Sequence, residues 1–311
     1  MLPDQIVVIH HRATDALQRC LAALQRHTPQ VPVRVLRTGG HDAPSGDLTR
    51  AHPHLRVDDV ANRSYASAVN DALRNAGGER VAILNDDVFV RADTLPALCA
   101  PLHDPRVALA GPLARTPDGA LQDQGWPYRL ATMTLDGAGP RAVRDVAWLS
   151  GCLFVARRSA ALHVGGMDAS LRFFNEDLEW CLRLRRRGWR CVLVGAEVTH
   201  AGGASTPSAA RFRIEGLRGG MVVARRHRAP VRRAAQRFAV WAWAAAAARR
   251  RRSADRDAWR AVARAFRHGR FDDAPFGAGL DDDAPGLPDA WPPWDGEGTT
   301  APAATDAGRG T

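Results

Sequence analysis

Two short clusters of acidic residues are the parts of this sequence best suited to chemistry. The first, Asn85-Asp86-Asp87, follows an apolar run at 81–84, and the second, Asn175 to Glu179, precedes a helix-like segment. In open α/β sheets, ligands bind beyond the carboxyl ends of the strands. Carboxylates placed there can hold a divalent metal, and a second acid nearby can act as a base. Together the clusters suggest an enzyme that works on a phosphorylated substrate.

Alternating strand-like and helix-like segments surround these clusters. Short apolar runs predict buried strands at 6–9, 31–36, 81–84, 107–110, 148–155 and 189–194. Apolar residues at helical spacing predict helices around 17–24, 65–73 and 94–102. This alternation predicts an α/β fold, a three-layer sandwich around a mostly parallel sheet.

The remaining segments suggest how the chain is divided. Gly, Pro and polar residues make 39–54 a loop and make 112–145 irregular, so that 112–145 could cover a site as a loop or hairpin. Beyond residue 211 the pattern is helical to about 268, and the last segment has the composition of a disordered tail. We therefore expect a catalytic domain at 1–210, an arginine-rich helical extension at 211–270 and an acidic tail at 271–311.

The net charge of +10 is concentrated near the C-terminal end. All 43 basic residues are arginine, which points to a genome bias and weakens the functional interpretation of any single one. Residues 225–270 carry fifteen arginines against two aspartates, whereas 271–311 carry nine acids against one arginine. The basic character therefore belongs mainly to the helical extension.

Cysteine usage and hydropathy limit the classes of protein. The five cysteines, which are odd in number and form no CxxC pair, each lie in an apolar stretch and favour buried thiols in a reducing cytosol. No secretory signal is recognisable at the start. The longest apolar run, 238–248, is well short of the ~20 residues that span a bilayer. A cytoplasmic protein is expected.

Five motifs in order resemble those of family-2 glycosyltransferases of the GT-A fold, in the rhamnosyltransferase-like bacterial branch. They cover roughly residues 5–206. They are Asn62-Arg63-Ser64-Tyr65 with Ala68-Val69-Asn70, Leu84-Asn85-Asp86-Asp87, Ser150-Gly151-Cys152, Gly165-Gly166-Met167-Asp168, and Glu176-Asp177 with Glu179, Arg183, Gly188-Trp189 and His200. Each motif alone is weak, and their order and spacing carry the resemblance.

The resemblance implies an inverting transfer of a sugar from a nucleotide-diphosphate sugar to a hydroxyl group. It assigns Asp177 as the general base, with Asn175 as the cap of its helix. Asp87, Asn85 and His200 would hold Mg²⁺ or Mn²⁺. Asp86, expected to face solvent or the ribose, stands with Asn62 and Asp42 on the nucleotide side. Gly151, Glu176 and Trp148 stand on the acceptor side.

The helix dipole gives a physical reason for the choice of base. Carboxylates in the first turn of a helix are stabilised as anions, so an ionised Asp177 is expected. Glu179 and Arg183 are expected to form only an i,i+4 pair on that helix.

Two segments depart from the family pattern on the nucleotide side. His10, His11 and Arg12 replace the usual residues after the first strand, and Arg37-Thr38-Gly39-Gly40 replaces a segment whose acid helps to hold the nucleotide. Either Asp42 substitutes through a shifted loop, or the base and ribose are recognised differently.

Several partners and functions remain open at this stage. The acceptor could be a glycan, a lipid-linked molecule or a small molecule. The arginine-rich helices could contact an anionic membrane at its inner face or could be simply solvated. No nucleic-acid module is recognisable.

Two alternative functions compete with sugar transfer. One is a nucleotide-sugar-binding or membrane-associated protein with impaired catalysis. The other is a nucleotidyltransferase, against which the glycine-free segment after the first strand argues.

Overall fold

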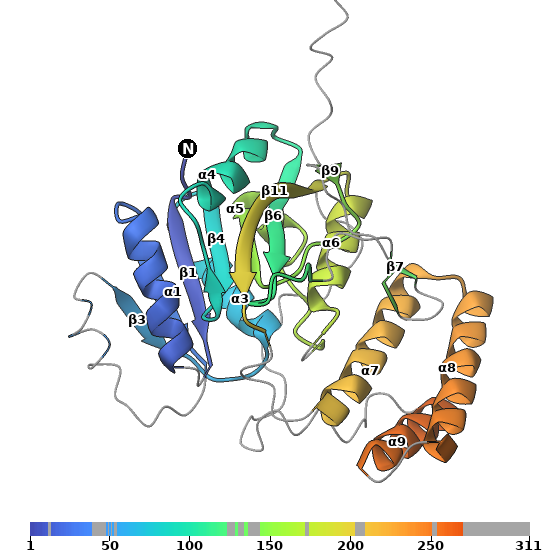
Figure 1. The fold of residues 1–311 in the computed structure, drawn as a ribbon. Helices are drawn as coiled ribbons and strands as arrows, with labels where there is room; N and C mark the ends of the chain where they lie inside the picture. Colours follow the sequence, from blue (N-terminus) through green and yellow to red (C-terminus); the bar gives the residue numbers. More distant parts are fainter. Residues whose placement is uncertain are drawn as a thin grey trace, which may run out of the picture.

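A computed structural model of the chain describes most of the sequence up to residue 269. The described residues are 1–11, 14–38, 48, 50, 52, 55–122, 128–129, 134–135, 144–171, 174–202, 209–250 and 254–269. Figure 1 shows a sheet with helices packed around it, and three further helices side by side at one edge.

One mixed sheet forms the centre of the described chain. Its strands follow the order β3-β2-β1-β4-β10-β6-β11-β5, and β9 pairs with β11. They are β1 (Gln5–His10), β2 (Val33–Arg37), β3 (Arg56–Asp59), β4 (Arg80–Asn85), β5 (Val88–Phe89), β6 (Val107–Arg115), β9 (Arg144–Asp145), β10 (Leu153–Arg157) and β11 (Arg190–His200). Two short strands, β7 (Tyr128–Arg129) and β8 (Thr134–Leu135), pair separately.

The pairing directions bring the chemically important residues to one edge. β1 runs parallel to β2 and β4, and β6 runs parallel to β11. β10 is antiparallel to both β4 and β6, so these two groups point the same way. The carboxyl ends of β1, β4 and β11, marked by His10, Asn85 and His200, therefore share an edge with the start of β10.

Helices cover both faces of this sheet. On one face, α1 (Thr14–His27) and α4 (Thr94–Cys99) pack their leucines against Ile6, Val8 and Leu84. On the other, α3 (Tyr65–Asn75), α5 (Arg158–His163) and α6 (Glu176–Arg186) cover Val7, Ile9 and Ile83. Alternate residues of one strand thus enter two separate cores, as the predicted three-layer sandwich requires.

Helix α3 shows how the local sequence produces this packing. Ser64 caps the helix, because its hydroxyl accepts a hydrogen bond of 3.0 Å from the amide of Ser67. Small residues then allow α3 to approach the sheet closely. Asn70 is buried and makes two hydrogen bonds to the backbone of Met167, of 2.8 and 2.7 Å, which fix the loop after α5.

The C-terminal helices build a core of their own. Leu217 and Met221 of α7 (Ala209–His227), Val240 and Ala244 of α8 (Pro230–Arg250), and Trp259 of α9 (Ala254–His268) lie in one buried cluster. Val223 of α7 belongs instead to the core beneath the sheet. Helix α7 therefore joins the extension to the sheet domain.

Several sequence-based boundaries differ from the structure. The strand expected at 148–155 begins only at Leu153, after a turn. The helix expected at 94–102 ends at Cys99 and continues as a 3₁₀ turn, because Pro101 has no amide to donate. The strand expected at 107–110 extends to Arg115, so the segment predicted to be irregular begins later.

Other expectations agree with the described chain. All five cysteines are free and buried, as predicted. Within the described residues, no helix is both long and apolar enough to cross a bilayer. The tail at 271–311 lies outside the described residues.

Candidate active site

Asp87 lies between the end of β4 and β5, the short strand that pairs with the end of β11. β5 follows Asp87 directly and pairs with the end of β11, in the register Val88 to His200. Asp87 Oδ2 accepts a hydrogen bond of 3.0 Å from the Gly202 amide, and His200 Nε2 lies 3.3 Å from Asp87 Oδ1. Burial raises the pKa of Asp87, but His200 and the Gly202 amide outweigh burial and hold the pKa below its usual value. Asp87 is therefore an anion.

The orientation of His200 is fixed by a residue from another segment. Gln122 contacts His200 twice: its Oε1 lies 2.6 Å from His200 Nδ1, and its Nε2 donates to the His200 carbonyl at 2.8 Å. An acceptor at Nδ1 favours the tautomer with its proton on that nitrogen. With a metal present, the lone pair of His200 Nε2 could bind it, whereas without one a proton on Nε2 would face Asp87 Oδ1, the contact that holds the Asp87 pKa down.

The residues at this edge fit a divalent metal. Asp87 Oδ1 is buried and receives no hydrogen bond from the described residues, so it has an unused lone pair. Asn85, the third predicted ligand, lies at the end of the same strand. The described residues contain no cluster of three His, Cys, Asp or Glu side chains. A metal held by one carboxylate and one imidazole needs further oxygen ligands, which a diphosphate would supply.

Asp86 faces the opposite direction, toward the end of β1. Its Oδ2 lies 2.5 Å from His10 Nδ1 and accepts a hydrogen bond of 3.1 Å from the His11 amide. Asp86 is only 5 % exposed, so the expectation that it might simply face solvent is wrong. Asn62 Nδ2 lies 3.5 Å from His11 Nδ1 and thus joins the same corner.

The altered nucleotide-side segment contains an ion pair that we did not predict. The Arg37 guanidinium lies 3.0 Å from Asp59 at the end of the neighbouring strand β3. An acid is therefore present beside Arg37, although it comes from a different strand. Asp42, the predicted substitute, lies outside the described residues.

Asp177 lies in the first turn of α6, next to the start of β10. Its Oδ2 accepts a hydrogen bond of 2.9 Å from the Gly151 amide, and its Oδ1 accepts one of 2.7 Å from the Leu178 amide. The predicted side-chain cap by Asn175 is absent. Asn175 stands at the cap position with a φ of 70°, and its side chain donates instead to the Gly216 carbonyl at 2.8 Å.

Burial dominates the electrostatics of the acidic pair in α6. It raises the pKa of Asp177, although the Gly151 and Leu178 amides oppose the rise. Burial and the neighbouring Asp177 raise the pKa of Glu176 further, and Glu176 Oε2 has no hydrogen-bond partner among the described residues. Burial therefore outweighs the helix dipole at Asp177, and a raised pKa makes its ionised carboxylate a stronger base.

Gly151 sits between this acidic pair and α3. The Tyr65 hydroxyl donates to the Gly151 carbonyl, and a Cβ at Gly151 would lie 3.0 Å from the Tyr65 ring. Trp148, also predicted on the acceptor side, is 9 % exposed and packs in the core. The structure thus brings Gly151, Glu176 and Asp177 together, while Trp148 lies beneath them.

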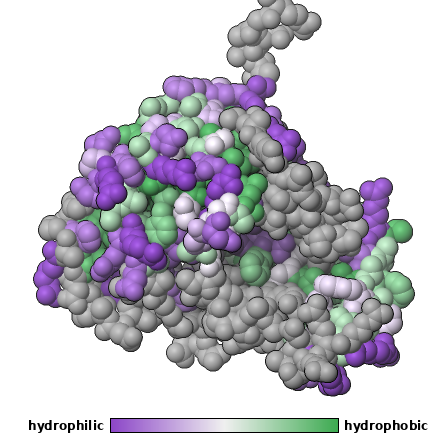
Figure 2. All heavy atoms as spheres, viewed as in Figure 1, coloured by the Kyte–Doolittle hydropathy of each residue, from purple (hydrophilic) through white to green (hydrophobic). Residues whose placement is uncertain are grey.

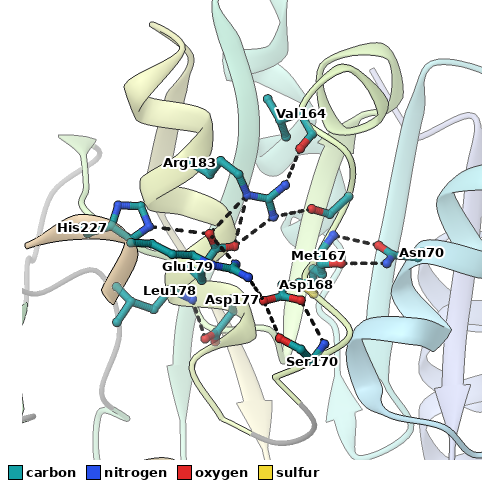
Figure 3. Close-up of polar contacts among 12 residues, drawn as sticks. Asn70, Val164, Met167, Asp168, Ser170, Asp177, Leu178, Glu179, Arg183 and His227 are labelled. Atoms are coloured by element: carbon teal, nitrogen blue, oxygen red, sulfur yellow. Dashed lines mark hydrogen bonds and ion pairs between the residues drawn. The ribbon is translucent and has the colours of Figure 1, made fainter. Parts of the chain in front are cut away.

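Glu179 is the centre of a charged cluster that sequence reasoning underestimated (Figure 3). Its side chain is fully buried and pairs with Arg183 at 2.9 Å, with Arg226 at 3.2 Å and with His227 at 3.6 Å. Burial by itself raises the pKa of Glu179, but His227 and the two arginines outweigh it and set the pKa at about 2. The expected pair of Glu179 with Arg183 is present, but it is only part of this cluster.

Two other residues of the site were not predicted. Tyr65 appeared only as part of a motif, and Gln122 carried no signal because it lies in the segment interpreted as irregular. Their partners, Gly151 and His200, are more than seventy residues away in the sequence.

Comparison with solved structures gives the fold. The fold is that of GT-A glycosyltransferases. The mannosyltransferase PcManGT from Pyrobaculum calidifontis, solved with GDP-Man and Mn²⁺, superposes with a TM-score of 0.54 at 19 % identity, over 91 % of this chain and 89 % of that one. GalNAc-T7, solved with UDP, GalNAc and Mn²⁺, gives 0.59 at 14 % identity over 72 % of this chain, which spans 48 % of GalNAc-T7.

Sequence comparison gives the family. The family described as "glycosyltransferase like family 2" matches residues 2–221, and the chain belongs to this family. It is 30 % identical over 234 residues to the N-acetylglucosaminyl-diphospho-decaprenol L-rhamnosyltransferase of Mycobacterium tuberculosis, covering 63 % of this chain and 75 % of the relative. The protein is a glycosyltransferase, and the alternative of nucleotidyl transfer is not supported.

The charge cluster predicts a large effect of one conservative substitution on stability. Glu179→Gln removes the carboxylate that pairs with the buried Arg183 guanidinium at 2.9 Å. Breaking a buried pair leaves a charge uncompensated and costs about 3–5 kcal/mol. We expect the free energy of unfolding in urea to fall by that amount.

Asp257→Asn is the matched control for this substitution. It breaks the exposed pair of Asp257 with Arg260 on α9 and should cost less than about 1 kcal/mol. Equal stability of the two variants would contradict the role of Glu179.

Proposed function

We propose that this glycosyltransferase inverts the configuration of the sugar it transfers, from a nucleotide-diphosphate sugar to an acceptor hydroxyl. The observation that supports this most is the link between the two acidic clusters through the backbone of Gly151 and Cys152. The Gly151 amide donates to Asp177, and the carbonyl of the next residue, Cys152, accepts from the Asn85 amide at 3.0 Å, two residues before Asp87. The proposed metal-binding acid and the proposed base thus lie on either side of the residues that lead into β10.

Asp87, His200 and Asn85 are the residues that would hold Mg²⁺ or Mn²⁺. When bound, the metal would neutralise the diphosphate as it leaves the anomeric carbon. Asp87 Oδ1, which receives no hydrogen bond from the described residues, and His200 Nε2, 3.3 Å from it, are the two atoms that would face the metal. Gln122 would keep the imidazole in the orientation that directs Nε2 toward Asp87.

Asp177 would act as the general base in this mechanism. Inversion requires a proton acceptor on the face of the sugar opposite the leaving diphosphate. The two amide hydrogen bonds keep the Asp177 carboxylate in one orientation, and its raised pKa strengthens it as a proton acceptor. Glu176, whose pKa is raised further, would stay protonated and could donate a hydrogen bond to the acceptor.

The nucleotide would lie at the ends of β1 and β2. Asp86 and Asn62 are the groups proposed to meet the ribose and base there, together with Asp42. The pair of Arg37 with Asp59 suggests that recognition of the base differs from the usual family arrangement.

The acceptor is the least defined substrate. The relative from Mycobacterium tuberculosis is named for a decaprenol-linked diphosphate acceptor and a rhamnosyl donor. We therefore favour a lipid-linked glycan over a small molecule, with Gly151, Glu176 and Trp148 on its side, and a role in cell-wall or polysaccharide biosynthesis.

This acceptor suggests where the enzyme works and how the chain divides. We propose a cytoplasmic location at the inner face of the membrane. A catalytic domain at 1–210, an extension at 211–270 and a tail at 271–311 suit that arrangement. Helix α7 contributes to both of the first two parts.

Removing the proposed base should stop turnover without weakening donor binding. Asp177→Asn keeps the shape of the side chain but cannot accept the proton, so kcat should fall about 10²–10⁴-fold. The donor-induced rise in Tm should stay the same. Asp257→Asn is the remote control, and wild-type activity in Asp177→Asn would refute the assignment. A wild-type protein that binds donor yet transfers from none would instead favour the catalytically impaired alternative.

The proposed metal site predicts which variant loses the Mn²⁺-dependent stabilisation by nucleoside diphosphates. Uridine, guanosine and thymidine diphosphates should be screened with and without Mn²⁺ by thermal melting. A diphosphate at 100 times its Kd stabilises the wild-type protein by about 2.7 kcal/mol. Asp87→Asn should lose the Mn²⁺-dependent part of that gain, whereas Asp177→Asn should keep it. If both variants kept the Mn²⁺-dependent gain in stability, the metal would bind elsewhere.

The pH dependence of kcat/KM follows from the pKa of Asp177. The base works only when ionised, so kcat/KM should fall tenfold per pH unit as the pH drops below that pKa. Burial raises the pKa above 3.8, and the acid limb should therefore begin above this value. Glu179, with a pKa of about 2, stays ionised over the same range and keeps its ion pairs. A rate that stays constant down to pH 4 would contradict this assignment.

A further inference from the structure

Helix α8 presents large apolar side chains to solvent. Val231, Phe238 and Trp243 are 80 %, 65 % and 54 % exposed, and they are three of the five exposed large hydrophobic residues in the described chain. Val231 and Phe238 are seven residues apart and therefore lie on the same side of the helix. Figure 2 shows apolar and pale residues along this outer edge of the molecule, between hydrophilic ones.

The opposite side of α8 already has its partners. Val240 and Ala244 are buried against α7 and α9. Arg237 also turns inward, where its guanidinium donates to the carbonyls of Phe266 and Arg267 at 2.7 and 2.8 Å. Val231 and Phe238 therefore form a second face of α8 outside the core of the extension, whereas the Trp243 ring also packs edge-on against Trp259 of α9, with ring centroids 4.4 Å apart.

Arginines lie near both ends of this second face. Helix α8 contains five arginines and no acidic residue. Arg232 and Arg249 are exposed, near opposite ends of the helix, and no ion pair within the described residues involves either. Arg249 follows Val231 by eighteen residues, which is five helical turns, so the two lie in one line along α8. Many of the residues between them are alanines, whose side chains are short.

We propose that the face of α8 formed by Val231 and Phe238, flanked by Arg232 and Arg249, docks on the surface of an anionic lipid bilayer. Helices with an apolar face and flanking arginines lie in the interfacial region of membranes. Each arginine near such a surface gains about 1 kcal/mol from anionic lipids. A second copy of this chain fits less well, because a symmetric contact would bring the arginines of two α8 helices together.

This inference rests on the proposed function for its biological purpose, because a lipid-linked acceptor is held in a bilayer. A structural path leads from the face to the active site. Helix α8 packs on α7, and Arg226 and His227 of α7 pair with Glu179, two residues beyond Asp177. Docking through α8 would hold the base-bearing helix α6 at the membrane surface together with its acceptor.

The test is co-sedimentation of the full-length protein with vesicles. One set contains phosphatidylcholine alone, and the other contains phosphatidylcholine with about one third phosphatidylglycerol, at low and at physiological salt. We expect at least tenfold stronger binding to the anionic vesicles, weakened by salt. Equal binding to both sets, or binding to neither, would overturn the proposal.

Two variants separate the apolar and the charged contributions. Val231→Ser with Phe238→Ser and Arg232→Gln with Arg249→Gln should each reduce binding to anionic vesicles at least tenfold, and the second should also reduce its salt dependence. Arg26→Gln with Arg74→Gln, which removes two charges from α1 and α3, is the matched control and should bind as the wild type does. Because all of these side chains are exposed, unchanged melting temperatures would confirm that the variants fold.

Other occupants of the face would give different results. A dimer in light scattering that Val231→Ser with Phe238→Ser dissociates, without vesicle binding, would assign the face to a second copy and overturn the proposal. Retention on DNA that only the arginine variant loses, again without vesicle binding, would also overturn it.

Activity assays keep this test separate from the proposed function. With a short-chain, water-soluble acceptor and no vesicles, Val231→Ser with Phe238→Ser should transfer sugar at the wild-type rate. With the acceptor embedded in anionic vesicles, its rate should fall along with its binding. Vesicle binding by a protein that transfers no sugar would contradict the proposed function alone, and transfer without vesicle binding would contradict docking alone.

Discussion

The carboxylate of Glu179 is buried away from solvent, and side chains of α6 and α7 compensate its charge. Arg183 comes from the same helix and also donates to the carbonyls of Val164 and Gly166, so it fixes the glycine turn after α5. Arg226 comes from α7 and extends from Glu179 to Asp168, 2.7 Å away. A buried anion cannot exchange these partners for water, so α6, the turn and α7 must keep one arrangement. The proposed base stands at the start of the helix so fixed.

The parallel sheet supplies the other half of the site. Parallel strands deliver their carboxyl ends to one edge, and β10, which runs in the opposite direction, brings Gly151 to the same edge. Asp87 is therefore positioned by strand pairing, whereas Asp177 is positioned by helix packing. The Gly151 amide connects the two, because it belongs to the turn before β10 and donates to the α6 carboxylate. A small shift of α6 would therefore change the length of this one hydrogen bond.

Sequence reasoning succeeded where the information is local. Apolar runs located the strands that carry Asn85 and His200, and the parallel arrangement implied that these residues would meet. It failed where a partner comes from a distant segment. Arg226 completes the Glu179 cluster across 47 positions, and Gln122 orients His200 from a segment without periodicity. The direction of β10 and the left-handed backbone at Asn175 also depend on tertiary packing, since the Asn175 side chain bonds to α7 rather than to its own helix.

Unpaired oxygens at both halves of the site argue for its use. Asp87 Oδ1 and Glu176 Oε2 are buried, and neither receives a hydrogen bond from the described residues. A buried acceptor without a partner costs about 1–3 kcal/mol, so two in one site oppose folding unless a ligand meets them. Asp86, at the same edge, is by contrast engaged by the His10 ring and the His11 amide. In the proposed mechanism these two oxygens would meet a metal and an acceptor hydroxyl, so substrate binding would supply the hydrogen bonds and metal contacts that the described residues do not.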